Sequence, residues 1–246
     1  STLEEFTAVG SSLYFYAYQA TYGWELWKSN GTTSGTVMVK DINSGSSSSH
    51  PTSSPSYLTA VGNTLYFQAT DGTHGYELWK SDGTANGTVM VKNINSAGSG
   101  TYYYTDITVV GNVIYFRADD GTNGHELWKS DGTANGTVMV KNIRYGSGDS
   151  NPAHFTAVGN TVYFEARNEF DGYELWKSDG TASGTVMVKD IDTTSTGMAG
   201  SGDSYPDQLT AVGNILYFQA DDGTSGTELW KSDGTASGTV MVKDIN

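Results

Sequence analysis

The chain contains no cysteine among its 246 residues, which excludes a disulfide framework, thiolate zinc sites and a cysteine nucleophile. Proline is also scarce, with four residues against 31 glycines, a balance that indicates many tight turns rather than disorder. No run of 18 apolar residues occurs, so we expect no membrane span. A chain of this length buries enough surface to form a core without cross-links.

Basic residues are few, 13 Lys and Arg against 27 Asp and Glu, and the net charge is −14. Ten of the 13 are lysines at two repeated positions, which leaves three arginines as the only singletons. No basic patch remains for phosphate groups or anionic lipid, and this excludes nucleic acid as a partner.

An octapeptide, "ELWKSDGT" or "ELWKSNGT", occurs five times, and its tryptophans are separated by 52, 49, 48 and 54 residues. Such a period is the signature of a repeat architecture. Each repeat contains four short runs rich in Val, Tyr, Phe, Leu, Trp and Thr, such as "SYLTAV", "TLYFQA", "YELWKS" and "TVMVKNI", and these runs predict four strands. The repeated tryptophans are Trp27, Trp79, Trp128, Trp176 and Trp230.

Two-residue Gly-Asn turns such as Gly62-Asn63 join the first two strands of a repeat, so these strands are antiparallel. The strands are apolar on both faces and need cover on both sides. We therefore predict one all-β domain over 1–246, a five-bladed β-propeller with four antiparallel strands per blade. The blades are expected at about 1–43, 44–95, 96–144, 145–192 and 193–246. Thr2 to Phe6 is expected to be the first strand of the first blade, not the outer strand of the last.

The segment "DGTHGYELWKSDGTANGTVMVKNI", preceded by "PSYLTAVGNTLYFQA", resembles the ELWxxDGT repeat of large, mostly bacterial, surface or secreted proteins. The likeness covers essentially the whole chain. It implies a propeller and an extracellular, secreted setting, but no settled activity. One departure is Tyr104, which stands where other repeats have a proline before the first strand, as at Pro55 and Pro152.

Sequence variation is concentrated on one expected face of the propeller, in the links between blades and between the second and third strands. Loops on a rigid scaffold usually carry function. The residue before each repeated Glu varies and is most often a ring, and an aromatic ring beside polar groups suits a sugar. The candidate ligand-binding residues are Trp24, Tyr76, His125, Tyr173, Thr227, His74, Tyr104, Tyr145 and Tyr205. The alternative is that these rings merely cover the ends of the blades.

The repeated acidic residues are expected to be structural, because a catalytic pair needs two carboxylates in different environments and a residue present in every blade has five equivalent ones. The Asp of "SDGT" is Asn30 in the first repeat, an interchange that suits a turn better than a metal site. The repeated glutamates are Glu25, Glu77, Glu126, Glu174 and Glu228.

No cofactor or catalytic residue is assigned. Calcium remains an option at Asp149 or Asp203, although no loop carries the alternating ligands of a calcium loop. Zinc is disfavoured because the four histidines lack paired spacing. Non-repeated charges predict ion pairs between blades, Arg117 with Glu165 and Arg167 with Asp119 or Asp221.

The sequence thus favours an extracellular, monomeric carbohydrate-binding module with several lectin-like sites, whose partners are glycans or proteins of a cell surface or matrix. A structural or protein-interaction propeller within a larger adhesin, with no small-molecule site, is the main alternative. A glycoside hydrolase acting through Glu165 is the lesser one and rests on analogy between folds alone.

Overall fold

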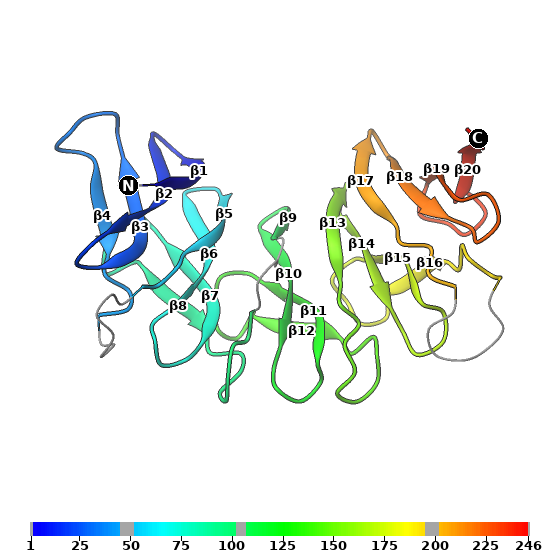
Figure 1. Ribbon diagram of the computed structural model, residues 1–246, viewed down its shortest axis with the longest axis horizontal. Coiled ribbons are helices and arrows are strands. Elements are labelled where there is room, and N and C mark those ends of the chain that lie inside the picture. Colours follow the sequence, from blue (N-terminus) through cyan, green and yellow to red (C-terminus); the bar gives the residue numbers. More distant parts are fainter. Residues whose placement is uncertain (1, 45–51, 102–106, 195–201, 246) are drawn as a thin grey trace. The chain divides into compact units, whose positions relative to one another are not determined.

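The computed structural model describes residues 2–44, 52–101, 107–194 and 202–245, and all regular secondary structure within them is β-strand. The strands form five antiparallel sheets of four, each in sequence order (Figure 1). The first two sheets consist of β1 (Leu3–Val9), β2 (Ser12–Gln19), β3 (Gly23–Ser29) and β4 (Val37–Lys40), then β5 (Ser56–Val61), β6 (Thr64–Thr70), β7 (Tyr76–Ser81) and β8 (Val89–Lys92).

The remaining three sheets repeat this plan along the chain. They consist of β9 (Thr108–Val110), β10 (Val113–Asp119), β11 (His125–Ser130) and β12 (Val138–Lys141); β13 (Ala153–Val158), β14 (Thr161–Arg167), β15 (Tyr173–Ser178) and β16 (Val186–Lys189); and β17 (Asp207–Val212), β18 (Ile215–Asp221), β19 (Thr227–Ser232) and β20 (Val240–Lys243). The predicted fold class, a five-bladed β-propeller with four antiparallel strands per blade, is confirmed. We number the blades 1 to 5 in chain order.

The chain divides into two compact units. The first unit contains blades 1 and 2 together with residues 119–121 and 131–137, and the second contains the rest of blade 3 with blades 4 and 5. Among the described residues no helix could cross a membrane.

The Gly-Asn turns close the first hairpin of a blade as predicted. In blade 2, Val61 pairs directly with Thr64 across the turn, and Gly62 has φ of 57°. A two-residue hairpin whose first central residue has positive φ matches the right-handed twist of the strands, and glycine reaches that conformation without strain.

The first strand of four blades contains a bulge that sequence did not reveal. In blade 2 the register shifts between Ser56 and Thr59, and Tyr57 between them has φ of 58°. A non-glycine residue in the left-handed region is strained, and a bulge re-aims side chains at the end of a sheet. The equivalent residues are Glu5 (φ 52°), His154 (φ 56°) and Gln208 (φ 55°).

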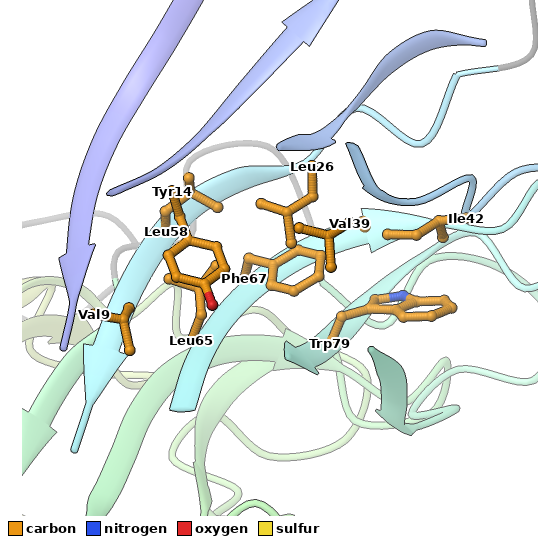
Figure 2. Packing of buried hydrophobic residues seen from close by; sticks show 10 residues of the cluster. Val9, Tyr14, Leu26, Val39, Ile42, Leu58, Leu65, Phe67 and Trp79 are labelled. Carbon is orange, nitrogen blue, oxygen red and sulfur yellow. The ribbon is translucent and has the colours of Figure 1, made fainter. Parts of the chain in front are cut away.

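Within each unit, consecutive blades pack face to face through aliphatic and aromatic side chains. Figure 2 shows the contact of blades 1 and 2, where Leu26 and Val39 of the first sheet meet Phe67 and Trp79 of the second. Leu26 and Phe67 are completely buried. Blade 4 packs against blade 3 on one face and, through the same positions, against blade 5 on the other. Its strands are apolar on both faces because both faces are covered.

Both repeated lysines of a blade reach the next blade. In blade 1, Lys28 Nζ donates to Gly83 O (2.7 Å), and Lys40 Nζ donates to Thr88 O (2.8 Å) and lies over the Trp79 ring. The Gly83 carbonyl belongs to the "SDGT" turn of the following repeat, and the Thr88 carbonyl belongs to the residue just before the fourth strand. The repeated tryptophan, lysines and turn therefore form one interface between blades.

The chain begins within blade 1. β1 pairs with β2, and Leu3 is opposite Ala17. Thr2 to Phe6 is accordingly not the outer strand of the last blade, as predicted.

Candidate functional site

The repeated glutamate is structural, as predicted. Glu25 is fully buried and accepts hydrogen bonds from Ile42 N (3.1 Å), Ser53 N (3.1 Å) and Ser53 Oγ (2.6 Å). Burial raises the pKa of Glu25 to about 7 despite these donors. This carboxylate ties the link between two blades to the start of β3, which fixes the loop beside Trp24. Glu77, Glu126 and Glu174 accept equivalent bonds.

The repeated Asp of the "SDGT" turn also has its predicted role. Asp82 Oδ1 accepts Thr84 N (2.8 Å) and Thr84 Oγ1 (2.7 Å), and these bonds hold its pKa below the usual value. Asn30 makes the same two contacts to Thr32 in blade 1, which explains why Asp and Asn interchange.

A pocket of about 330 Å³ opens between blades 1 and 2, on the face where sequence variation is concentrated. It is hereafter called the Trp24 pocket. Two predicted residues, Trp24 at the start of β3 and Tyr76 at the start of β7, line it. The full lining is Glu4, Glu5, Tyr16, Trp24, Ser54, Pro55, Ser56, Tyr57, Gln68 and Tyr76.

Aromatic rings form one side of the Trp24 pocket. Tyr16 and Tyr18 meet the Trp24 ring at steep angles of 71° and 62°, with centroid separations of 5.4 and 5.7 Å. Tyr16 Oη donates to Glu4 Oε2 (2.7 Å), and burial together with this bond raises the Tyr16 pKa. A ring assembly held at its polar end is a rigid platform.

A buried acceptor without a partner completes the pocket. Gln68 is only 3% exposed, and its Oε1 has no hydrogen-bond partner among the described residues. Leaving a buried polar atom unpaired costs roughly 1 to 3 kcal/mol. Such an atom beside a pocket is a candidate acceptor for a donor from outside the chain.

The sequence did not predict the other eight residues that line the pocket, which are Glu4, Glu5, Tyr16, Ser54, Pro55, Ser56, Tyr57 and Gln68. Two signals were present. Tyr16 and Gln68 occupy the same position of the second strand, and this position varies between blades: it is Arg117, Glu165 and Gln219 in the other three. The residues equivalent to Ser56 and Tyr57 in the first strand also vary. The bulge that turns Glu5 and Tyr57 to the pocket has no mark in the sequence.

The counterpart position between blades 4 and 5 brings together two other predicted residues. Tyr173 and Tyr205 stack with centroids 5.6 Å apart and planes at 23°. Tyr205 Oη donates to Asp203 Oδ2 (2.9 Å), and Asn151 Nδ2 donates to Tyr173 Oη (3.2 Å).

The two predicted histidines each have a nearby carboxylate. His125 Nδ1 lies 3.0 Å from Asp149 Oδ1, which also accepts the His125 N–H (2.8 Å). His74 Nδ1 lies 2.8 Å from Asp71 Oδ2 in its own turn. Neither lines the Trp24 pocket. Tyr145 is 86% exposed, Thr227 is exposed at the start of β19, and Tyr104 lies outside the described residues.

A larger hollow of about 470 Å³ lies on the sheet of blade 5, against Leu229 and Ile245. Leu229 is 40% exposed, whereas its equivalent Leu175 is buried by the packing of blade 5. The hollow is therefore the flat face of a blade, and its position in the fold does not identify a ligand site.

The predicted ion pairs need correction. Glu165 lies against His154, with Nε2 3.5 Å from Glu165 Oε2, rather than against the predicted Arg117. Arg167 Nε donates to Asp149 O (3.0 Å), and its guanidinium lies over the Tyr173 ring, 5.2 Å from the centroid. The reason is that the preceding link folds back over the end of β14, where Arg167 N donates to Ser150 O, so a carbonyl replaces the predicted acids.

His154 also contacts Asp207 Oδ1 through Nδ1 (3.2 Å). Burial, followed by Asp207 and Asp203, raises the pKa of Glu165 to about 7. Asp149 and Asp203, the calcium candidates, already accept hydrogen bonds from the backbone N–H groups of His125 and Tyr173. No group of three metal-ligating side chains occurs among the described residues.

Comparisons with known proteins identify the fold alone. No family model matches the chain, and no curated protein does. The computationally designed Ika8 protein shares 16% identity over 99% of this chain and 62% of its own, with a TM-score of 0.49. Prolyl oligopeptidase B from Galerina marginata, bound to a 35mer substrate, shares 10% identity over 98% of this chain and 36% of its own (TM-score 0.54).

A puromycin hydrolase mutant complexed with PGG shares 14% identity over 98% of this chain and 39% of its own (TM-score 0.51). This chain spans between 32% and 62% of the length of the first solved structures that it matches. At these identities the likeness is one of fold and carries no activity over to this chain.

Proposed function

We propose that the chain is an extracellular carbohydrate-binding module whose principal site is the Trp24 pocket. The observation that carries this proposal is Gln68, a buried amide with an unpaired acceptor beside the aromatic platform of Trp24. A sugar offers an apolar ring face to stack on an indole and hydroxyl groups to donate to an acceptor, so it satisfies both features together.

Other groups in the Trp24 pocket suit hydroxyl groups as well. Glu5 Oε2 accepts the Leu58 N–H (3.1 Å), which leaves its other carboxylate oxygen available as an acceptor. Ser54 Oγ lies 3.2 Å from Thr52 Oγ1, and either hydroxyl is able to donate. The volume of about 330 Å³ is at the lower end for small-molecule sites, enough for one or two sugar rings.

Resemblance to the ELWxxDGT repeat of surface and secreted proteins supports the extracellular setting, where glycans of a cell surface or matrix are available as partners. The Trp24 pocket contains two of the predicted rings, Trp24 and Tyr76. We therefore propose it as the principal site of a monomeric module.

Glycan-array binding tests the proposal. The wild type is expected to bind a defined set of glycans, and Trp24→Ala and Gln68→Leu are each expected to weaken that binding at least tenfold, or by about 1.4 kcal/mol. Tyr173→Ala is the matched control, because this ring occupies the same place in blade 4 but is covered by Tyr205.

A blank array, or binding that is indifferent to both pocket variants, would reject the proposal. That outcome would instead support the structural or protein-interaction propeller. Turnover of a bound glycan that disappears in Glu165→Gln would support the enzyme alternative.

A further inference from the structure

Two equivalent positions in the propeller differ in whether they are open. In the first, the ring that begins the third strand is Trp24 and the residue before the conserved proline of the next blade is Ser54. In the second, these places are taken by Tyr173 and Tyr205. Each position lies within one compact unit, so the comparison needs no placement of one unit against the other.

Tyr205 fills the second position with a ring of the protein itself. Its ring is nearly parallel to that of Tyr173, at 23° and 5.6 Å, and its hydroxyl donates to Asp203. This six-membered ring has an apolar face on an aromatic plate and a hydroxyl on a carboxylate. Those are the contacts that a pyranose makes with a protein.

At the first position Ser54 is too short to reach the aromatic plate. Tyr16 and Tyr18 meet the Trp24 ring at steep angles, so neither of them lies parallel to it. The φ angle is nearly the same in both places, 42° at Ser54 and 44° at Tyr205. The side chain at this position, serine or tyrosine, therefore decides whether a ring of the protein lies on the aromatic plate.

Charge restricts what the open site accepts. Glu4 and Glu5 both line the Trp24 pocket, and among the described residues no Lys, Arg or His lines it. The chain as a whole carries −14. A carboxylate-bearing sugar would bring like charges together in a partly enclosed space, whereas an amine would gain a charge-assisted hydrogen bond.

We propose that the Trp24 pocket selects a pyranose without negative charge, neutral or amine-bearing, whose ring lies on Trp24 in the place that Tyr205 takes on Tyr173. This inference rests on the proposed carbohydrate function and specifies the class of sugar and the position of its ring.

Binding of three tetrasaccharides, of glucose, glucosamine and galacturonic acid, tests the selectivity by calorimetry at low and moderate salt. The glucose or glucosamine chain is expected to bind at least tenfold more tightly than the galacturonic acid chain. If the acidic chain binds as well or better, the sugar-binding function stands and the selectivity is wrong. If no chain binds and a broad glycan array is also blank, both are wrong.

Ser54→Tyr tests the position of the ring. The variant should fill the pocket as Tyr205 fills its counterpart, lower affinity for the bound tetrasaccharide at least tenfold, and protect Trp24 from acrylamide quenching. Ser54→Ala is the control: it removes the hydroxyl but leaves the pocket open, so Trp24 should stay as accessible to acrylamide as in the wild type.

Quenching is also measured in Trp24→Phe, alone and combined with Ser54→Tyr. If the change in quenching comes from Trp24, Ser54→Tyr should have no effect on quenching in the Trp24→Phe background. Tyr205 shows that tyrosine adopts this backbone, and a melting curve verifies that Ser54→Tyr is folded. Unchanged quenching and unchanged affinity in a folded Ser54→Tyr variant would overturn the placement of the ring, even if the protein binds sugars.

Discussion

Lys177 Nζ donates to the carbonyl oxygen of Gly234, 2.8 Å away, and so joins blade 4 to the turn of blade 5. The same bond links Lys129 to Gly180, and the turn itself is held by its own aspartate. The recurrence of "ELWKSDGT" therefore has a structural cause, since the first half of the motif in one blade binds the second half in the next.

Lys177→Met removes this bond and keeps the length of the apolar stem. We expect a loss of roughly 1.5 kcal/mol in the free energy of unfolding, the lower end for hydrogen bonds to charged groups because Lys177 is partly exposed. Urea denaturation followed by tryptophan fluorescence measures it. Lys231→Met, at the equivalent and exposed position of blade 5, is the control and should stay within about 0.5 kcal/mol. Equal losses in both variants would contradict a role for the bond.

Alanine substitutions at Gly83 and Gly62 distinguish backbone strain from steric collision as the cost of replacing a glycine. Both have positive φ, 87° and 57°, so alanine is strained at either position by roughly 1 to 2 kcal/mol. A Cβ at Gly83 would also collide with Tyr14 Oη, whereas at Gly62 it would meet no atom within 4 Å. We therefore expect Gly83→Ala to lower the denaturation midpoint clearly more than Gly62→Ala. A larger effect at Gly62 would show that the turn of blade 2 is not packed against blade 1 as described.

Buried glutamates make stability depend on pH. Burial raises the pKa of Glu77 to about 7, above the value of 4.5 for an unperturbed Glu. The folded protein then holds a proton that the unfolded chain releases, so this contribution to stability is present below pH 4.5 and is lost as pH rises through about 7. The turn aspartates, such as Asp82, have lowered pKa values and act oppositely, losing their contribution as pH falls below 3.8.

We accordingly expect maximal stability in mildly acidic solution and a decline between about pH 5 and pH 8. Glu77→Gln should flatten part of that decline, although it costs roughly 1 to 3 kcal/mol near pH 5 because its amide faces backbone N–H donors. Urea midpoints across this range, with Glu4→Gln as an exposed control, measure both effects. A stability that rises towards pH 8 would contradict the raised pKa of the repeated glutamates.

Repetition explains why much of the fold was predictable. Strand number, hairpin turns and the structural roles of Glu77 and Asp82 all followed from features that recur in every blade. The Trp24 pocket was predicted only in part. Trp24 and Tyr76 could be predicted because the residue before the repeated Glu varies between blades. Tyr57 reaches the pocket because of a bulge, and the sequence does not indicate that this residue adopts a left-handed conformation. Arg167 was likewise predicted to pair with an acidic side chain, but it donates to the backbone carbonyl of Asp149. Every residue has a backbone carbonyl, so the sequence does not show which one an arginine will bind.

We expect the stability of the protein and its glycan binding to be independent of calcium, although the sequence suggested Asp149 and Asp203 as calcium ligands. Asp149 Oδ1 accepts from His125 N and lies against its ring, while Asp203 accepts from Tyr173 N and Tyr205 Oη. A carboxylate already used by several protein donors has little free capacity for a cation that needs six to eight oxygen ligands. We therefore expect the melting temperature and glycan binding to be the same in excess EDTA as in millimolar calcium, whereas Asp149→Ala lowers the melting temperature in both. A calcium-dependent rise in the wild type that Asp149→Ala or Asp203→Ala abolishes would instead establish a metal site there, because a ligand that binds only the folded state raises its stability.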